Sequence, residues 1–248
     1  MKTTGRTILI TGATSGIGKG LAERFLDAGN RVVVGGRRRE LLDEFTAAHP
    51  GTASVVVDVA DPESISAAVD TVTREHPGLD VVVTMAGIML PEDLRDPGHL
   101  ATAESIIETN LLGTIRTLTA FTPWIAGKAD GVLMTVSSGL AFVPLPATPT
   151  YSATKAAVHS YTQSLRVQLA QTPVQVIELV PPAVQTTLMG QQDDPSALPL
   201  ADYLDETMRI LMEQPEVEEV LVDRVRFLRD AEAEGRHADV LALLGGRH

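Results

Sequence analysis

Short runs of Val, Ile and Leu alternate with amphipathic helical patterns along most of this chain, and this alternation limits the folds open to it. Between the runs, Gly29-Asn30 is a helix stop, and Asp61-Pro62 is a helix start with Asp61 as the N-cap. Apolar strands separated by helices are typical of a parallel sheet covered on both faces. We therefore predict an α/β fold, a single-domain Rossmann-like doubly wound parallel sheet of about six strands in the order 3-2-1-4-5-6. The strand candidates are Thr7–Ile10, Val32–Val34, Val55–Val59, Leu79–Val83, Gly131–Val136 and Val174–Val180.

The sequence shows no internal repeat, low-complexity tract or linker, so we expect one domain over residues 1–248. Residues 7–190 carry the alternation and form the expected core. Residues 191–248 are strongly acidic and are expected to form the rest of a short lid, which spans 187–202, and a helical tail. Apolar residues between Val217 and Leu228 fall on one helical face, which predicts a helix there and no seventh strand.

Composition and charge exclude several classes of function. A formal net charge of −12 disfavours a general nucleic-acid binder, because phosphate contacts need clustered Lys and Arg. The chain has no cysteine, and its six histidines are scattered without the spacing of a metal site. Its apolar runs are too short to span a membrane. We expect a cytoplasmic protein that binds no metal, membrane or nucleic acid.

A glycine-rich segment follows the first strand candidate and opens the first helix. It reads Thr11-Gly12-Ala13-Thr14-Ser15-Gly16-Ile17-Gly18. Gly12 permits a tight turn, Gly16 lets the backbone approach a pyrophosphate, and Gly18 allows the helix to pack closely on the strand. The free N–H groups of the helix start, around Ile17, bind the anion. This context predicts a dinucleotide-binding loop rather than an ordinary turn.

The residues that end the second strand candidate indicate which dinucleotide binds. A carboxylate there would bond the ribose 2′-OH of NAD and repel a 2′-phosphate, whereas an arginine does the reverse. Gly36 stands at this place and Arg37 follows it. We therefore expect NADP(H), with NAD(H) as the alternative, and a hydroxyl contact from Ser15 to the same phosphate. Arg38 and Arg39 are equally consistent with a solvated helix start.

Tyr151 and Lys155 form a Y-x-x-x-K pair, which places both side chains on one face of a helix. A nearby ammonium stabilises a phenolate and lowers the pKa of the phenol, so Tyr151 is suited to general acid or base catalysis at a carbonyl or alcohol oxygen. Alone, this spacing usually marks only a helix face. Ser138 ends the fifth strand candidate, where the sites of α/β proteins lie, and its hydroxyl is placed to hold the substrate oxygen.

These motifs resemble the short-chain dehydrogenase/reductase family, whose fingerprint T-G-x-x-x-G-x-G matches residues 11–18. The resemblance spans residues 7–190 and implies a catalytic tetrad of Asn110, Ser138, Tyr151 and Lys155. Within it, Asn110 would kink its helix and bind a water that relays protons from the lysine; a tolerated polar residue is the alternative. The implied cofactor contacts beyond the loop and Arg37 are Asp58 and Val59 at the adenine, Ala86 and Gly87, Tyr151 and Lys155, and Pro181, Val184 and Thr186 around the nicotinamide.

Three places in the sequence leave alternatives open within that resemblance. A residue that only terminates its strand is the alternative for Asp58. Thr84-Met85 stands where relatives commonly have two asparagines, and Pro182 replaces a glycine of the P-G-x-V-x-T loop. We expect the first departure to remove structural hydrogen bonds around the fourth strand and the second to stiffen the loop.

Further segments resemble the DltE-like oxidoreductase subgroup of that family, namely residues 137–144, 181–184, 226–228 and 241–244. The segments expected above the nicotinamide are apolar, which predicts a small apolar ketone, aldehyde or alcohol as substrate. They are Met89, Leu90, Leu140–Pro146 and Leu188–Met189. The resemblance also implies a homodimer through the helices that hold Asn110 and Tyr151, with a tetramer possible.

The main alternative to an enzyme is a non-catalytic Rossmann protein that senses NADP(H) and acts through a partner. Thr84-Met85 and Pro182 favour the sensor, whereas a complete tetrad favours catalysis, because a sensor has no use for Ser138 beside Tyr151. We therefore predict an oxidoreductase that transfers hydride between a nicotinamide and a carbonyl or alcohol, with Tyr151 as general acid or base.

Overall fold

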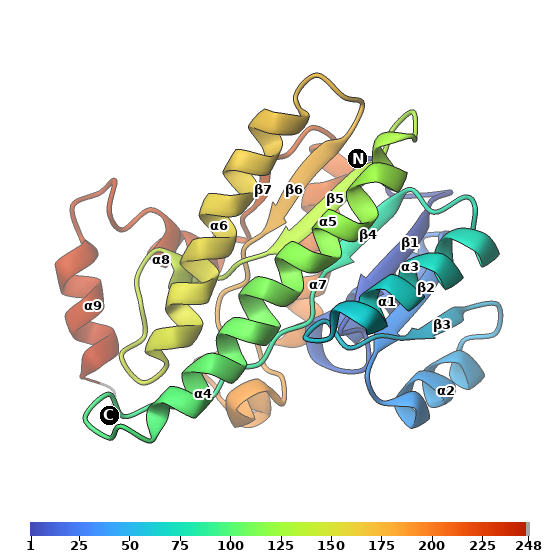
Figure 1. Ribbon diagram of the computed structural model, residues 1–248. Helices are drawn as coiled ribbons and strands as arrows, with labels where there is room; N and C mark the ends of the chain where they lie inside the picture. The colour runs from blue at the N-terminus through green and yellow to red at the C-terminus, as the bar shows by residue number, and fades with distance from the viewer. Residues whose placement is uncertain (247–248) are drawn as a thin grey trace.

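The computed structural model describes residues 1–246, which contain a sheet of seven strands with every neighbouring pair parallel (Figure 1). The order β3-β2-β1-β4-β5-β6-β7 confirms the predicted doubly wound topology for the first six strands. The strands are β1 (Thr7–Thr11), β2 (Arg31–Gly36), β3 (Ala53–Val56), β4 (Val81–Thr84), β5 (Val132–Val136), β6 (Gln175–Leu179) and β7 (Glu219–Val220).

The prediction of a helix between Val217 and Leu228, with no seventh strand, is wrong. The segment contains β7, which pairs Glu219 with Glu178 and Val220 with Leu179, and then two short helical turns. A two-residue strand is too short to show the period of two that identifies strands in a sequence. The apolar residues of this segment are spaced as on one face of a helix, so the sequence pattern resembled that of a single helix. The turns are η4 (Asp223–Val225) and α8 (Arg226–Arg229).

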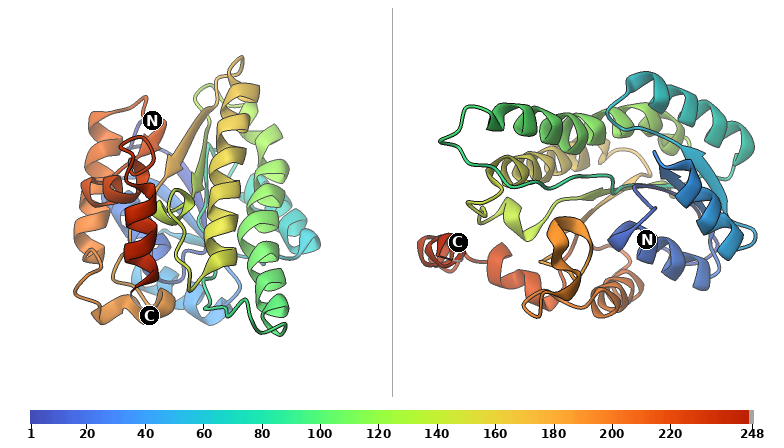
Figure 2. Two further views of the ribbon diagram at one scale, coloured as in Figure 1. Left: turned by 90° about the vertical axis from the view of Figure 1, so that its left-hand side faces the viewer. Right: turned by 90° about the horizontal axis from the view of Figure 1, so that it is seen from below.

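Helices cover both faces of the sheet (Figure 2). On one face, Phe25, Phe45 and Tyr203 are buried against the strands. Each fully buried side chain of this size stabilises the fold by roughly 1.5–3 kcal/mol. The helices of this layer are α1 (Gly16–Asp27), α2 (Arg39–Ala48) and α7 (Leu200–Glu213).

The opposite layer begins with a helix whose start was predicted. The Asp61 carboxylate accepts a hydrogen bond from the Glu63 N–H at 2.9 Å, and Pro62 is the first helical residue, so the predicted N-cap is confirmed. Val72 and Phe121 are buried on this face. The layer consists of α3 (Pro62–Glu75), α5 (Gly113–Ala126) and α6 (Pro149–Leu169); α4 (His99–Ile106) and the π-helical η1 (Ile107–Leu112) lead into α5.

The chain continues beyond β7 into a small satellite core at the edge of the molecule (Figure 1). Val143, from the segment after β5, packs there with Ala231, Val240 and Leu244. Val240 and Leu244 belong to α9 (His237–Gly245). The carboxyl end of β5 is therefore covered by residues that follow it by about a hundred positions. Among residues 1–246, no helix has the length and apolar character needed to cross a bilayer.

Candidate active site

A cleft of about 700 Å³ lies at the carboxyl ends of the strands. This is where ligands bind in open α/β sheets. Every predicted catalytic or cofactor-binding residue lines it except Asn110. The lining residues from that prediction are Gly12, Ser15, Gly16, Ile17, Gly18, Arg37, Asp58, Val59, Ala86, Gly87, Ser138, Tyr151, Lys155, Pro181, Val184 and Thr186.

The glycine loop between β1 and α1 forms one wall of the cleft. Gly12 has a φ of +70°, and a β-carbon there would lie 2.7 Å from the Cα of Ala86, so only glycine fits. A β-carbon at Gly18 would lie 2.4 Å from the carbonyl oxygen of Gly12. Ser15 is the N-cap of α1, but its hydroxyl makes no capping hydrogen bond. The loop therefore keeps its helix start open to an anion.

Two arginines stand at the end of the cleft that follows β2. Arg38 donates from Nη2 to the Thr14 hydroxyl at 2.9 Å, which holds its guanidinium over the glycine loop. The guanidinium of Arg37 is largely exposed, and its Nη1 lies 4.0 Å from Asp58. From the sequence, only Arg37 was predicted to contact the 2′-phosphate, because nothing there distinguished Arg38 from a residue of a solvated helix start. The Thr14 contact is the observation that brings Arg38 into the site.

Asp58 and Val59 lie just beyond β3, which ends earlier than predicted, at Val56. The Asp58 carboxylate accepts a hydrogen bond from the Ala60 N–H at 3.0 Å, and its own N–H bonds to the Ser64 hydroxyl at 2.9 Å. These bonds fix the turn into α3 in the manner of an Asx-turn. Asp58 thus has a structural part as well as a place in the cleft.

Ser138, Tyr151 and Lys155 converge at the middle of the cleft. The Ser138 hydroxyl accepts a hydrogen bond from Leu140 N–H at 3.1 Å, so it caps η2 (Gly139–Ala141) while it faces the phenol of Tyr151. Lys155 Nζ donates to the carbonyl of Val136 at 2.8 Å and lies 5.5 Å from the centre of the Tyr151 ring. All three side chains are buried.

Burial controls the protonation of both ionisable groups at this point. It raises the pKa of Tyr151 to about 12, against the opposing hydrogen bond with Ser138. It also lowers the pKa of Lys155 to about 8, although the Glu178 carboxylate favours the charged amine. The sequence argument expected the ammonium to lower the phenol's pKa. In this structure desolvation outweighs that effect, so Tyr151 holds its proton at neutral pH.

Asn110 lies behind the cleft wall, in η1. Its amide bonds both backbone groups of Ile88, with Oδ1 accepting from the N–H and Nδ2 donating to the carbonyl, each at 2.8 Å. A β-carbon at Gly87 would lie 3.3 Å from Asn110 Oδ1 and 3.9 Å from Lys155 Nζ. Asn110 therefore anchors the segment after β4 close to Lys155. The residues around Asn110 form a π-helical turn, whereas the resemblance implied a kink in this helix.

The two departures from the family pattern both have structural replacements. The Thr84 hydroxyl donates to the Met134 carbonyl at 3.3 Å, which ties β4 to β5. The loop containing Pro182 is held by a short parallel bridge between Val184 and Leu198. Pro181 accepts a hydrogen bond from the Gly139 N–H at 2.9 Å. Neither departure closes the cleft.

The far end of the cleft is apolar and includes residues that sequence analysis missed. Met89, Leu140, Leu145 and Leu188 line it as expected, whereas Leu90, Met189 and the remaining residues of 141–146 do not. The missed residues come from the tail. Its acidic composition indicated a solvated helical surface, so its apolar side chains were not expected in the cleft. They are Phe227, Leu228, Leu243 and Leu244. The predicted lid at 187–202 forms η3 (Leu188–Asp193) and the entry to α7.

Comparison with known proteins identifies the family. The model of the short chain dehydrogenase family matches residues 6–197. The chain belongs to the short-chain dehydrogenase/reductase family. Over 237 residues it is 37% identical to the uncharacterized oxidoreductase DltE of Bacillus subtilis, and the match covers 93% of each chain. This similarity confirms the predicted resemblance to DltE-like oxidoreductases.

Solved structures of two oxidoreductases share this architecture. A short-chain dehydrogenase from Burkholderia cenocepacia, solved with NADP, aligns with a TM-score of 0.85 at 26% identity and covers 98% of this chain and 99% of its own. The 3-ketoacyl-(acyl-carrier-protein) reductase of Brucella melitensis, solved with NADH, aligns with a TM-score of 0.78 at 25% identity, covering 88% and 96%. The first neighbour was solved with a dinucleotide that carries a 2′-phosphate, and the second with one that lacks it. The choice between them therefore depends on this chain's own residues.

Proposed function

We propose that this short-chain dehydrogenase/reductase is an NADP(H)-dependent oxidoreductase that transfers hydride between the nicotinamide and a small apolar ketone, aldehyde or alcohol. One observation carries the proposal. A single cleft joins an anion-binding glycine loop with two guanidinium groups at one end to Ser138, Tyr151 and Lys155 in the middle. Such a combination serves a reaction at a carbonyl or alcohol beside a bound dinucleotide.

The residues present fit NADP(H). Ser15 has a hydroxyl without a capping bond, and the start of α1 offers free N–H groups to the pyrophosphate. Arg38, held by Thr14, and Arg37, which has only a distant carboxylate, supply the charge and fork geometry that a 2′-phosphate needs. When bound, the nicotinamide supplies or accepts the hydride. Val184 and Thr186 would hold its carboxamide.

The chain's own residues manage the proton. Ser138 and Tyr151 together face the position of the substrate oxygen. Because Tyr151 holds its proton at neutral pH, its phenol can give that proton to an oxygen that gains negative charge as hydride arrives at carbon. Lys155 stands beside the phenol and stabilises the phenolate that remains. The protonated form of Tyr151 that prevails at neutral pH is therefore the form that carbonyl reduction needs.

The apolar end of the cleft supports the proposed substrate class. Met89, Leu140 and Leu145 line the cleft together with the tail residues Phe227 and Leu244. Arg224 also lines the cleft, and its Nη2 donates a hydrogen bond to the Ser196 carbonyl. An uncharged apolar group beside the reacting carbonyl is therefore favoured.

A titration of the purified protein with NADPH and with NADH, followed by nicotinamide fluorescence, tests the cofactor. Clearly tighter NADPH binding and turnover in a screen of apolar aldehydes and ketones are expected. Tyr151→Phe should abolish turnover and keep NADPH affinity. A protein that binds NADPH but turns over no carbonyl, and whose cellular effect survives Tyr151→Phe, would instead be a sensor.

We also propose that the protein acts in the cytoplasm as a homodimer paired through α4–α5 and α6. Exposed apolar side chains on these helices support the interface, with Leu100 at 57% and Val167 at 76% exposure. Sedimentation equilibrium of the wild type and of Val167→Asp tests it. A dimer that the aspartate dissociates is expected, and a monomeric wild type would refute it.

A further inference from the structure

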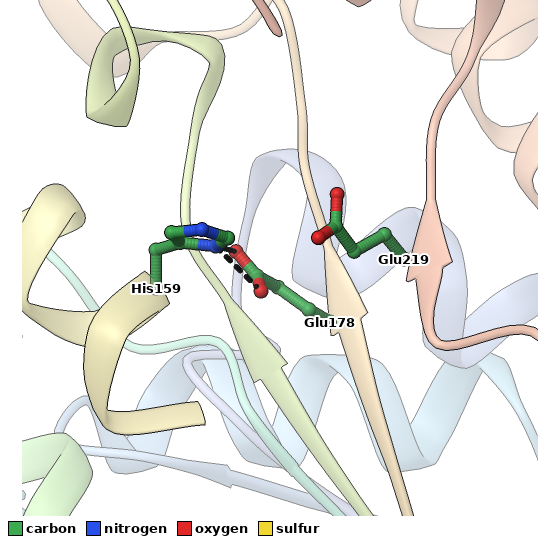
Figure 3. A group of neighbouring side chains, drawn as sticks. All are labelled: His159, Glu178 and Glu219. Atoms are coloured by element: carbon green, nitrogen blue, oxygen red, sulfur yellow. Dashed lines mark hydrogen bonds and ion pairs between the residues drawn. The ribbon is translucent and has the colours of Figure 1, made fainter. Parts of the chain in front are cut away.

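A cluster of ionisable side chains lies where α6, β6 and β7 come together (Figure 3). It consists of His159 from α6, Glu178 from β6 and Glu219 from β7. Glu178 is fully buried within a strand of the parallel sheet. An ionised carboxylate in such a place costs several kcal/mol in desolvation unless its neighbours compensate.

The compensation comes from two neighbouring elements. His159 Nδ1 lies 2.9 Å and 3.0 Å from the two carboxylate oxygens of Glu178, and the Ser137 hydroxyl donates to the same carboxylate. Phe142 packs edge-on against the imidazole with ring centres 4.7 Å apart. Glu178 therefore has a fixed position.

A metal ion is not the occupant that these three side chains favour. Arg229 donates to both carboxylate oxygens of Glu219, at 2.7 Å and 3.1 Å, and already supplies the positive charge. A cation would have to displace this guanidinium and also the bonds from Ser137 and His159. The cluster is instead a hydrogen-bonded charge network.

The network meets the catalytic residues at three consecutive positions of the β5 end. Lys155 Nζ donates to the carbonyl of Val136, Ser137 donates to Glu178, and Ser138 faces Tyr151. His159 follows Lys155 by one helical turn on α6, so the two side chains share a face. Glu178 is thus joined to the strand end that carries Ser138 and to the helix that carries Lys155.

We propose that Glu178, held by His159 and Ser137, is a positioning residue that keeps Lys155 charged and fixes the β5 strand end for catalysis. Its catalytic consequence rests on the proposed function, but its effect on Lys155 does not. The Glu178 carboxylate raises the pKa of Lys155 and so opposes the effect of burial. Loss of that charge leaves Lys155 neutral over more of the working pH range, and a neutral amine no longer stabilises the Tyr151 phenolate.

The other charged groups facing this network leave Glu178 as the partner of Lys155. On the outer side, Glu219 and Arg229 form a bidentate pair. Further along α6, Arg166 faces Glu218. His159 is the remaining titratable group in contact with Glu178. These pairs predict that neutralising Glu178 changes Lys155, whereas neutralising Glu219 does not.

The chain contains only four lysines, Lys2, Lys19, Lys128 and Lys155, so their side-chain NMR signals can be resolved and titrated individually. With lysine labelled at Cε, the Lys155 signal is assigned by its loss in Lys155→Met. In Glu178→Gln, which preserves shape and hydrogen bonding, its titration midpoint should fall by about one pH unit. Glu219→Gln is the matched control and should leave the midpoint unchanged. An unchanged midpoint in Glu178→Gln would overturn the inference.

Kinetics and a second variant complete the test. In Glu178→Gln we expect kcat to fall about tenfold with KM for the carbonyl within about twofold, because Lys155 acts on the proton-transfer step. If that variant does not fold, Ser137→Ala serves. It should lower kcat by a similar factor without moving the Lys155 midpoint, and full activity would overturn the inference. A shifted midpoint in a protein without carbonyl turnover would contradict the proposed function alone.

Discussion

At the scale of single residues, the two arginines after β2 are held in different ways. Arg38 is bonded to Thr14, whereas Arg37 is free to reorient near Asp58. A guanidinium that contacts a phosphate directly contributes about 1.5–3 kcal/mol. We expect Arg37→Ala and Arg38→Ala each to raise the Kd for NADPH by about 10- to 100-fold.

Binding of NADH is the internal control for these variants. It should change by less than about threefold, because NADH has no 2′-phosphate for the arginines to contact. Fluorescence titration of each variant with both dinucleotides measures the difference. Equal losses for NADPH and NADH would show that the arginines hold the loop rather than the phosphate.

The protonation of Tyr151 predicts different pH profiles for the two directions of the reaction. Burial raises the pKa of this phenol to about 12, so the acid form needed for reduction persists to alkaline pH, whereas the phenolate needed for oxidation is scarce at neutrality. We expect kcat/KM for carbonyl reduction to stay level to about pH 8, above which Lys155 loses its charge, and kcat/KM for alcohol oxidation to rise about tenfold per pH unit up to that point. An oxidation profile that levels off below pH 8 would show that Lys155 overcomes burial.

At the scale of elements, α9 lines the cleft with apolar side chains, and we expect it to affect substrate specificity. Leu243 lines the cleft and is half-exposed, whereas Leu241 of the same helix packs only into the satellite core. Leu243→Ala should raise KM for an apolar carbonyl by about three- to tenfold and leave the Kd for NADPH unchanged. Leu241→Ala is the matched control. A KM that rises equally in both variants would mean that α9 acts through general stability.

The elements also show what sequence patterns can and cannot predict. The six long strands and the Asp61 cap were readable because apolar runs and capping chemistry are local. Tyr151, Lys155 and Ser138 were readable because each stands at a fixed place relative to a strand end or a helix turn. β7 could not be predicted, because a strand of two residues is too short to show the alternating pattern that identifies strands. The contribution of α9 and the Glu178 network depend on contacts between distant segments, which no local pattern encodes.

At the scale of the whole molecule, the buried Lys155 ties folding stability to pH. Burial lowers its pKa from 10.5 to about 8, so between these values the unfolded chain binds more protons than the folded one. The free energy of unfolding therefore increases as pH rises through that window, by about 2 kcal/mol between pH 7.5 and 9.5. Lys155→Met lacks this contribution.

Chemical denaturation of the wild type and Lys155→Met at both pH values isolates the effect, because all other groups titrate equally in the two proteins. The wild type should gain about 2 kcal/mol relative to the variant on going to pH 9.5. A constant difference between the two proteins would mean that Lys155 keeps its ordinary pKa in the folded state.

The brief seventh strand has a consequence for how these molecules behave toward one another at high concentration. β7 is an edge of the sheet, and an edge strand offers unpaired backbone groups on which another chain can add a strand. Two residues offer few such groups, and the Glu219 side chain there is bound by Arg229, which places charge at the margin. Lengthening β7 with uncharged β-branched residues would create an edge strand long enough to pair with another chain and so would promote aggregation.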